Sequence, residues 1–81
     1  MKYLAIETWD DNSYIVKTKK DDISLGIIYF YKPWKKWVFE PYEGTFYDAE
    51  CMKDIIRFME EELKWVKNKM KMYIHMLLLQ Q

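Results

Sequence analysis

The stretch that decides the fold is residues 27–39, which read IIYFYKPWKKWVF. Its first five residues are all apolar or aromatic. Such a run is typical of a strand that is covered on both faces or that exposes one aromatic face. Pro33 lacks a backbone N–H and cannot donate to a sheet ladder, so it suits the turn that follows. A further strand begins at Trp37, and the stretch therefore predicts a β-hairpin.

Two more strands are predicted on the N-terminal side of this hairpin. They are rich in aromatic and β-branched side chains, which favour strands, and clusters of Asp, Asn, Ser and Lys mark the turns between them. The pattern indicates an antiparallel sheet of about four strands over residues 3–42. The predicted strands are residues 3–9, 14–18, 23–31 and a fourth that starts at residue 37.

A helix is predicted to follow the sheet. Asp48 is the best N-cap, because its carboxylate can accept hydrogen bonds from the first free backbone amides. Glu50 suits the positive end of the helix dipole. No Gly or Pro interrupts the sequence after that point. We therefore predict an α+β fold in one domain, residues 1–81, in which the sheet is followed by one long C-terminal helix over residues 48–79.

The predicted helix carries an apolar seam whose steps alternate strictly between four and three residues, the spacing of a coiled coil. The first half of the seam is expected to pack on the sheet, with Ile56 and Met59 buried. Trp37 and Phe39 are expected to share one face of the sheet, because side chains alternate along a strand. The seam consists of Met52, Ile56, Met59, Leu63, Val66, Met70, Tyr73 and Leu77.

The predicted helix is too long for the sheet to cover. It would measure on the order of 50 Å, whereas strands of five to nine residues span roughly 17–30 Å. The second half of the seam could fold back near Asn68, lie on a partner protein or pair with a second copy. We expect a homodimer, since an uncovered seam would leave a large apolar patch in water. The expected dimer interface is Leu63, Val66, Met70, Tyr73 and Leu77.

Charges beside the seam leave the direction of helix pairing open. In an antiparallel pair centred near Trp65, Glu60 faces Lys67 of the other copy. Glu62 then faces Lys69. In a parallel pair Glu62 still reaches Lys67 of the other copy, so the preference for the antiparallel pair is modest.

The hairpin stretch also interleaves aromatic rings with lysines. Trp and Tyr are common anchors of protein interfaces, so this stretch is a predicted partner-binding surface, although the rings could instead be the core of an ordinary hairpin. A further alternative is a small nucleic-acid-binding module that uses residues 29–39, with rings stacked on bases and ammonium groups against phosphates. Thirteen basic and thirteen acidic residues cancel, which makes nucleic acid the less expected partner. The predicted partner-binding residues are Tyr29, Tyr31, Trp34, Lys35 and Lys36.

Few residues could carry chemistry. The chain has one cysteine, Cys51, and one histidine, His75, which excludes an intrachain disulfide and the usual zinc sites. An unbroken helix would hold these two residues about 36 Å apart, too far for a nucleophile and its base. There is also no Gly-rich phosphate loop. We therefore expect no catalytic residue, no metal and no cofactor, and hence no enzyme.

No targeting signal is expected in this sequence. Residues 1–9 lack the apolar run of a signal peptide. The apolar run at residues 74–79 is too short to span a bilayer. Together with a free cysteine, these features predict a cytoplasmic protein with no membrane partner.

Over about half of the chain, the sequence resembles small uncharacterised proteins encoded in bacteriophage and prophage genomes. The resemblance implies a phage origin and an accessory role in the infected cell, and it supplies no catalytic residue. By analogy, it implies a protein that binds and modulates a host or defence protein. The residues that carry the resemblance are Leu25-Gly26, Trp34, Trp37, Phe39-Glu40-Pro41, Thr45-Phe46, Cys51-Met52, Ile55, Phe58 and Met59.

Overall fold

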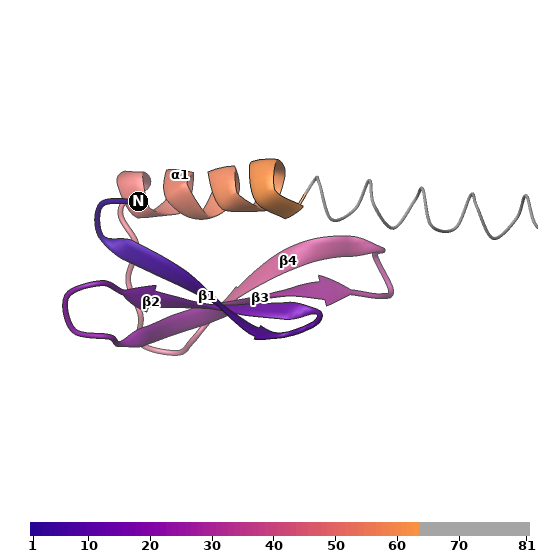
Figure 1. Cartoon of the computed structure of the whole chain (residues 1–81), viewed down its shortest axis with the longest axis horizontal. Coiled ribbons are helices and arrows are strands. Elements are labelled where there is room, and N and C mark those ends of the chain that lie inside the picture. Colours follow the sequence, from indigo (N-terminus) through magenta and orange to yellow (C-terminus); the bar gives the residue numbers. More distant parts are fainter. Residues whose placement is uncertain (64–81) are drawn as a thin grey trace, which may run out of the picture.

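The computed structural model describes residues 1–63 as an antiparallel sheet of four strands followed by a helical segment (Figure 1). The strands lie in sequence order, so that each pairs with the next. The prediction of an α+β fold with about four antiparallel strands before the helix is confirmed. The elements are β1 (Leu4–Asp10), β2 (Ser13–Thr18), β3 (Ser24–Tyr31), β4 (Lys36–Pro41), the α-helix α1 (Ala49–Arg57) and a π-helical turn, η1 (Phe58–Glu62).

The described helical segment is short. It ends at Leu63, so the second half of the helix predicted over residues 48–79 lies outside the described residues. Its start is as predicted: the Asp48 carboxylate accepts a hydrogen bond from the Cys51 backbone N–H at 2.8 Å. This hydrogen bond is also the main reason that the pKa of Asp48 lies below its ordinary value.

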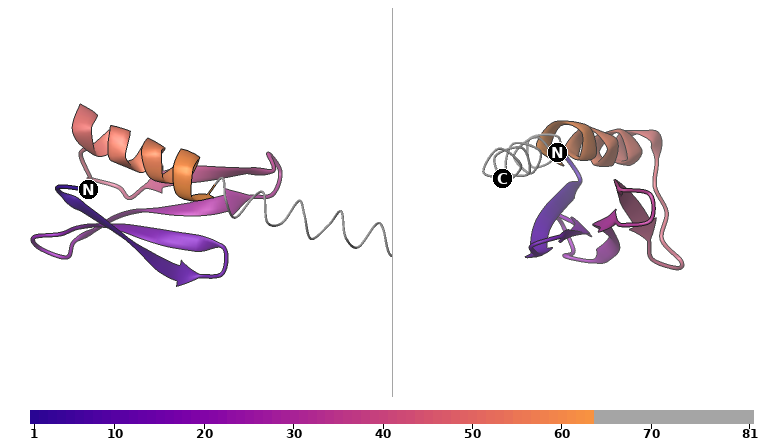
Figure 2. Two further views of the ribbon diagram at one scale, coloured as in Figure 1. Left: turned by 45° about the horizontal axis from the view of Figure 1, so that its top comes forward. Right: turned by 90° about the vertical axis from the view of Figure 1, so that its right-hand side faces the viewer.

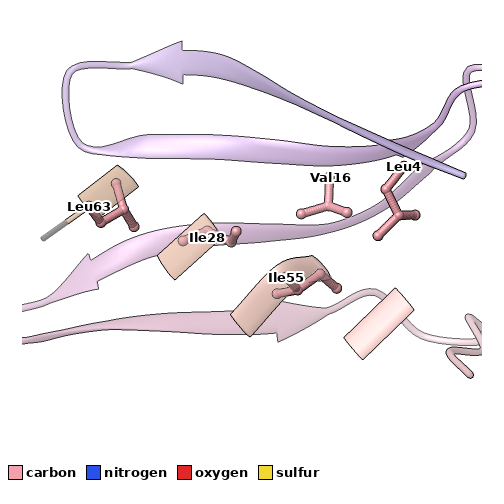
Figure 3. Packing of buried hydrophobic residues seen from close by; sticks show 5 residues of the cluster. All are labelled: Leu4, Val16, Ile28, Ile55 and Leu63. Carbon is pink, nitrogen blue, oxygen red and sulfur yellow. The ribbon is translucent and has the colours of Figure 1, made fainter. Parts of the chain in front are cut away.

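The core lies between one face of the sheet and the helical segment. Pairing sets Ile28 opposite Phe39 and Phe30 opposite Trp37, which puts these side chains on one face of the sheet. Both Trp37 and Phe39 pack against the core, so the prediction that they share a face is confirmed. The five buried side chains at the centre are Leu4, Val16, Ile28, Ile55 and Leu63 (Figure 3).

The rotation of the helix differs from the sequence prediction. Ile56, predicted to be buried, is 51% exposed, whereas its neighbour Ile55 is 3% exposed and belongs to the core. Met59 is half-buried and packs against the edge of the core. Phe58 also faces the sheet, where its ring meets the Tyr14 ring edge-on at 5.2 Å. The prediction for Ile56 was wrong because two apolar lines run side by side on this helix, and the neighbouring line contacts the sheet.

The π-helical turn η1 brings Leu63 onto the face of Ile55. The Leu63 N–H donates to the Phe58 carbonyl, five residues earlier, so this turn holds an extra residue. One residue corresponds to about 100° of helix rotation. In a regular α-helix, Leu63 would continue the line of Met52 and Ile56. The extra residue turns Leu63 into the core instead, where it is 1% exposed.

A close contact between β3 and β4 fixes the segment that leads to the helix. A Cβ on Gly26 would come within 2.7 Å of the Phe39 ring and of the Glu40 carbonyl oxygen, so only glycine fits there. The Phe39 ring meets the Tyr47 ring edge-on at 5.5 Å. The Tyr47 hydroxyl donates to the Leu25 carbonyl at 2.6 Å. Tyr47 therefore ties the chain to the sheet immediately before the helix begins.

Replacing Ile55 with Ala should reduce the free energy of unfolding by about 2–5 kcal/mol, because it empties a buried aliphatic site. The matched control is Ile56→Ala in the next position, which should cost less than about 1 kcal/mol, since that side chain is already half in water. Urea denaturation of dilute protein measures both. Equal losses would contradict the helix rotation described above.

Candidate functional site

The face of the sheet that points away from the helix has an apolar centre bordered by charged side chains. Ile15 pairs with Ile27 and Tyr29 pairs with Val38, so these four side chains share that face. Figure 2 shows α1 on one side of the twisted sheet, and no element formed by residues 1–63 packs on the other side. We call this surface, which also includes Tyr31, the open face.

An aromatic row runs along the open face to the tip of the hairpin. The Tyr29 and Tyr31 rings lie 6.5 Å apart, and the Tyr31 and Trp34 rings lie 5.2 Å apart, both pairs nearly perpendicular. This is the edge-to-face geometry that aromatic pairs prefer. Trp34 at the tip is 66% exposed. The aromatic row of Tyr29, Tyr31 and Trp34 is therefore ordered by its own ring contacts and is accessible from solvent.

The turn between β3 and β4 positions Trp34. The Trp34 N–H donates to the Tyr31 carbonyl at 3.2 Å, and the Lys35 N–H donates to the Lys32 carbonyl at 3.1 Å. Lys35 has a φ of +52°, a left-handed conformation that lets the chain reverse into β4. These constraints hold the Trp34 ring against Tyr31, although no core contact fixes it.

The two predicted lysines border a hollow that is separate from the aromatic row. Lys35 and Lys36 border a hollow of about 320 Å³ between the hairpin and the end of the helical segment, which Phe30, Trp37, Met59, Glu60 and Leu63 also line. Lys36 pairs with Tyr31 and so lies near the aromatic row as well. The structure therefore brings together the three predicted rings and places the lysines between this row and the hollow.

Burial raises the pKa of Tyr29, and the negative charge of Glu40 raises it further. At neutral pH the Tyr29 phenol is thus uncharged and remains a hydrogen-bond donor. At the β1–β2 end of the open face, Lys17 lies 3.1 Å from the Glu7 carboxylate and 3.5 Å from that of Asp22. The contact with Glu7 is the main cause of the raised pKa of Lys17. At this end, the apolar centre of the face is therefore bordered by charged side chains that pair with one another.

Reactive groups are scarce in the described part of the chain. Cys51 is half-buried, and burial raises the pKa of its thiol, which disfavours the nucleophilic thiolate. Residues 1–63 contain no group of three His, Cys, Asp or Glu side chains placed to hold a metal ion. None of the helices in this range is long and apolar enough to cross a membrane. His75 lies outside the described residues.

The residues predicted for a dimer interface are not found together in the structure. Leu63 belongs to the core of its own chain, so its side chain is not available to a second copy. The other four, Val66, Met70, Tyr73 and Leu77, lie outside the described residues. The exposed helix residues that the sequence analysis assigned to the core are Met52 and Ile56.

Comparison with protein-family models, with curated proteins and with solved structures finds no match for this chain. The resemblance to phage-encoded proteins therefore stays a prediction. The arguments that follow depend on the geometry of the described residues.

Replacing Glu40 with Gln should lower the pKa of Tyr29, because it removes the negative charge that opposes ionisation of the phenol. NMR titration of the Tyr29 ring resonance measures this shift. Because the pKa of Tyr29 in the folded chain lies above its ordinary value of 10.0, the folded state disfavours the ionised phenol, and the free energy of unfolding falls as the pH rises from 10.0 to the folded value. Glu43→Gln, in the loop after β4, is the matched control and should leave Tyr29 unchanged. An equal shift in both variants would contradict the assignment to Glu40.

Proposed function

We propose that this chain is a non-enzymatic interaction protein of the phage type, which acts as a homodimer in the cytoplasm of the host cell and binds a host or defence protein through its open face. The observation that carries the proposal is the aromatic row, which ends in the exposed Trp34 and lies on a sheet face that no other described element covers. Tyr29, Tyr31, Trp34, Lys35 and Lys36 are the proposed partner-binding residues.

The physical argument is that the row is an ordered anchor. Trp and Tyr dominate the energetics of protein interfaces, because they bury a large area and also offer a polar tip. Binding costs less entropy when these side chains are already held in place. The edge-on contacts of Tyr31 with Tyr29 and with Trp34 restrict all three rings before any partner arrives. Around this apolar centre, Lys36 and Glu40 supply a charged rim.

The same surface is less suited to nucleic acid. A single-strand site needs a basic groove beside the stacking rings. Here Lys35 lines the hollow and Lys36 lies beside the row, but Glu40 adds a negative charge next to Tyr29. A titration with labelled single- and double-stranded oligonucleotides at two salt concentrations separates the alternatives. Binding that weakens steeply with salt would favour nucleic acid over protein.

Capture from cell extract with tagged protein should recover a partner that Trp34→Ala loses. The matched control is Trp9→Ala, which removes a ring that is 71% exposed near the C-terminal end of β1, the strand at the opposite edge of the sheet from β4. Both variants should change the free energy of unfolding by less than about 1 kcal/mol, because neither ring is buried. Mass spectrometry of the captured material reports the partner.

A partner that is lost with Trp34→Ala and kept with Trp9→Ala would support binding through the open face. Equal capture by both variants would contradict it. If Trp34→Ala instead cost about 3–5 kcal/mol of stability, the ring would belong to the core, and another surface would have to bind the partner.

A further inference from the structure

The helical segment exposes an apolar stripe on the side next to the hollow. Met52 and Ile56 are both about half exposed, at 49% and 51%. Met59 follows at the same helical spacing and lines the hollow together with Trp37 and Phe30. We call Met52, Ile56 and Met59 the outer stripe. Because Ile55 and Leu63 form the core contact, the outer stripe does not contribute to the centre of the core.

We propose that the outer stripe is the contact with a second copy of this chain, in which two α1 helices run antiparallel across a twofold axis at Ile56. The inference rests on the homodimer in the proposed function. It places the contact on described residues, whereas the sequence analysis centred it farther along the chain and included Leu63.

Antiparallel pairing makes the outer stripe complementary to itself. With Ile56 on the axis, Met52 of one copy meets the partner's Met59, and the reverse contact forms at the same time. A twofold interface of this kind uses one patch twice. The partner's Met52 also comes to the mouth of the hollow beside Met59, and a flexible, unbranched methionine suits an irregular apolar space.

The charges beside the stripe favour the same arrangement. Lys53 and Glu60 are both exposed, and neither makes an ion pair within residues 1–63. In the antiparallel pair, Lys53 of one copy faces the partner's Glu60, and this contact occurs twice. A parallel pair in register would instead set Lys53 against the partner's Lys53.

Pairing with a second copy would also add to the small amount of apolar burial within one chain. Only five apolar side chains form the buried centre of residues 1–63. Small domains of this size commonly gain stability from a disulfide, a metal or a partner subunit. The single cysteine cannot form an intrachain disulfide. Burial of the outer stripe against its own copy supplies additional apolar contact without changing the monomer core.

Sedimentation of the whole chain at micromolar concentrations should give a dimer, and Ile56→Glu should give monomers, because two buried carboxylates would meet on the axis. The matched control is Ile23→Glu, which makes the same change at a similarly exposed isoleucine, 54%, in the turn before β3. This control should stay dimeric. Circular dichroism should show that both variants are folded, because neither substitution lies in the core.

A charge exchange tests the antiparallel register. Lys53→Glu alone and Glu60→Lys alone should each raise the dissociation constant about fivefold, because each creates two repulsive contacts. An equal mixture of the two variants should form heterodimers of wild-type affinity, since both contacts then pair opposite charges. A parallel in-register pair predicts no weakening by Lys53→Glu, because a lysine pair merely becomes a glutamate pair.

Each result decides a different part of the proposal. A wild-type chain that sediments as a monomer would overturn the homodimer as well as this interface. A dimer that survives Ile56→Glu would overturn the outer stripe and leave a homodimer held by another surface. Single variants that weaken the dimer without recovery in the mixture would overturn the antiparallel register. Partner capture through Trp34 is a separate measurement, so its failure would not be confused with any of these.

Discussion

The packing of Ile55 and Leu63 onto Leu4, Val16 and Ile28 is the contact on which the other surfaces depend. Burying a large aliphatic side chain is worth about 1.5–3 kcal/mol, so these few residues supply much of the apolar burial that a short chain can achieve. The contact also fixes the rotation of the helix. With Ile55 turned toward the sheet, Ile56 must point away from it, and the only helix in the described part of the chain covers one sheet face. The open face and the outer stripe both follow from this position and rotation of the helix.

Much of the fold could be predicted from the sequence, because local signals and the global fold agree. Strand alternation predicted that Trp37 and Phe39 share a face, and the capping chemistry of Asp48 predicted where the helix starts. The rotation of the helix could not be predicted in the same way. The line of Ile55 and Phe58 and the line of Met52 and Ile56 both follow a helical period, and only tertiary contacts, such as that between Phe58 and Tyr14, decide between them.

The π-helical turn could not be predicted from the apolar periodicity of the sequence either. Residues 58–62, FMEEE, carry no Pro or Gly that would mark an irregular turn. The extra residue is explained by packing. The regular α-helical hydrogen bond of Leu63 is replaced by one to the Phe58 carbonyl, and Leu63 becomes buried in the core. At the candidate site, the aromatic character of the hairpin was visible in the sequence. The division between an aromatic row and a separate hollow was not, since it depends on how the turn at Lys35 reverses the chain.

The two proposed surfaces lie on opposite sides of the same small body, and this arrangement has a consequence for binding. The outer stripe belongs to the helix side, whereas the aromatic row lies on the sheet face away from the helix, so a second copy would leave both open faces uncovered. A twofold dimer would then present two identical aromatic rows. If the target carries two matching sites within reach, the second contact becomes intramolecular, and avidity can exceed the affinity of one face by a factor of about 10²–10⁴. Dimerisation would in this way strengthen target binding without any new contact to the target, which gives the helix side a role in a function that the sheet face performs.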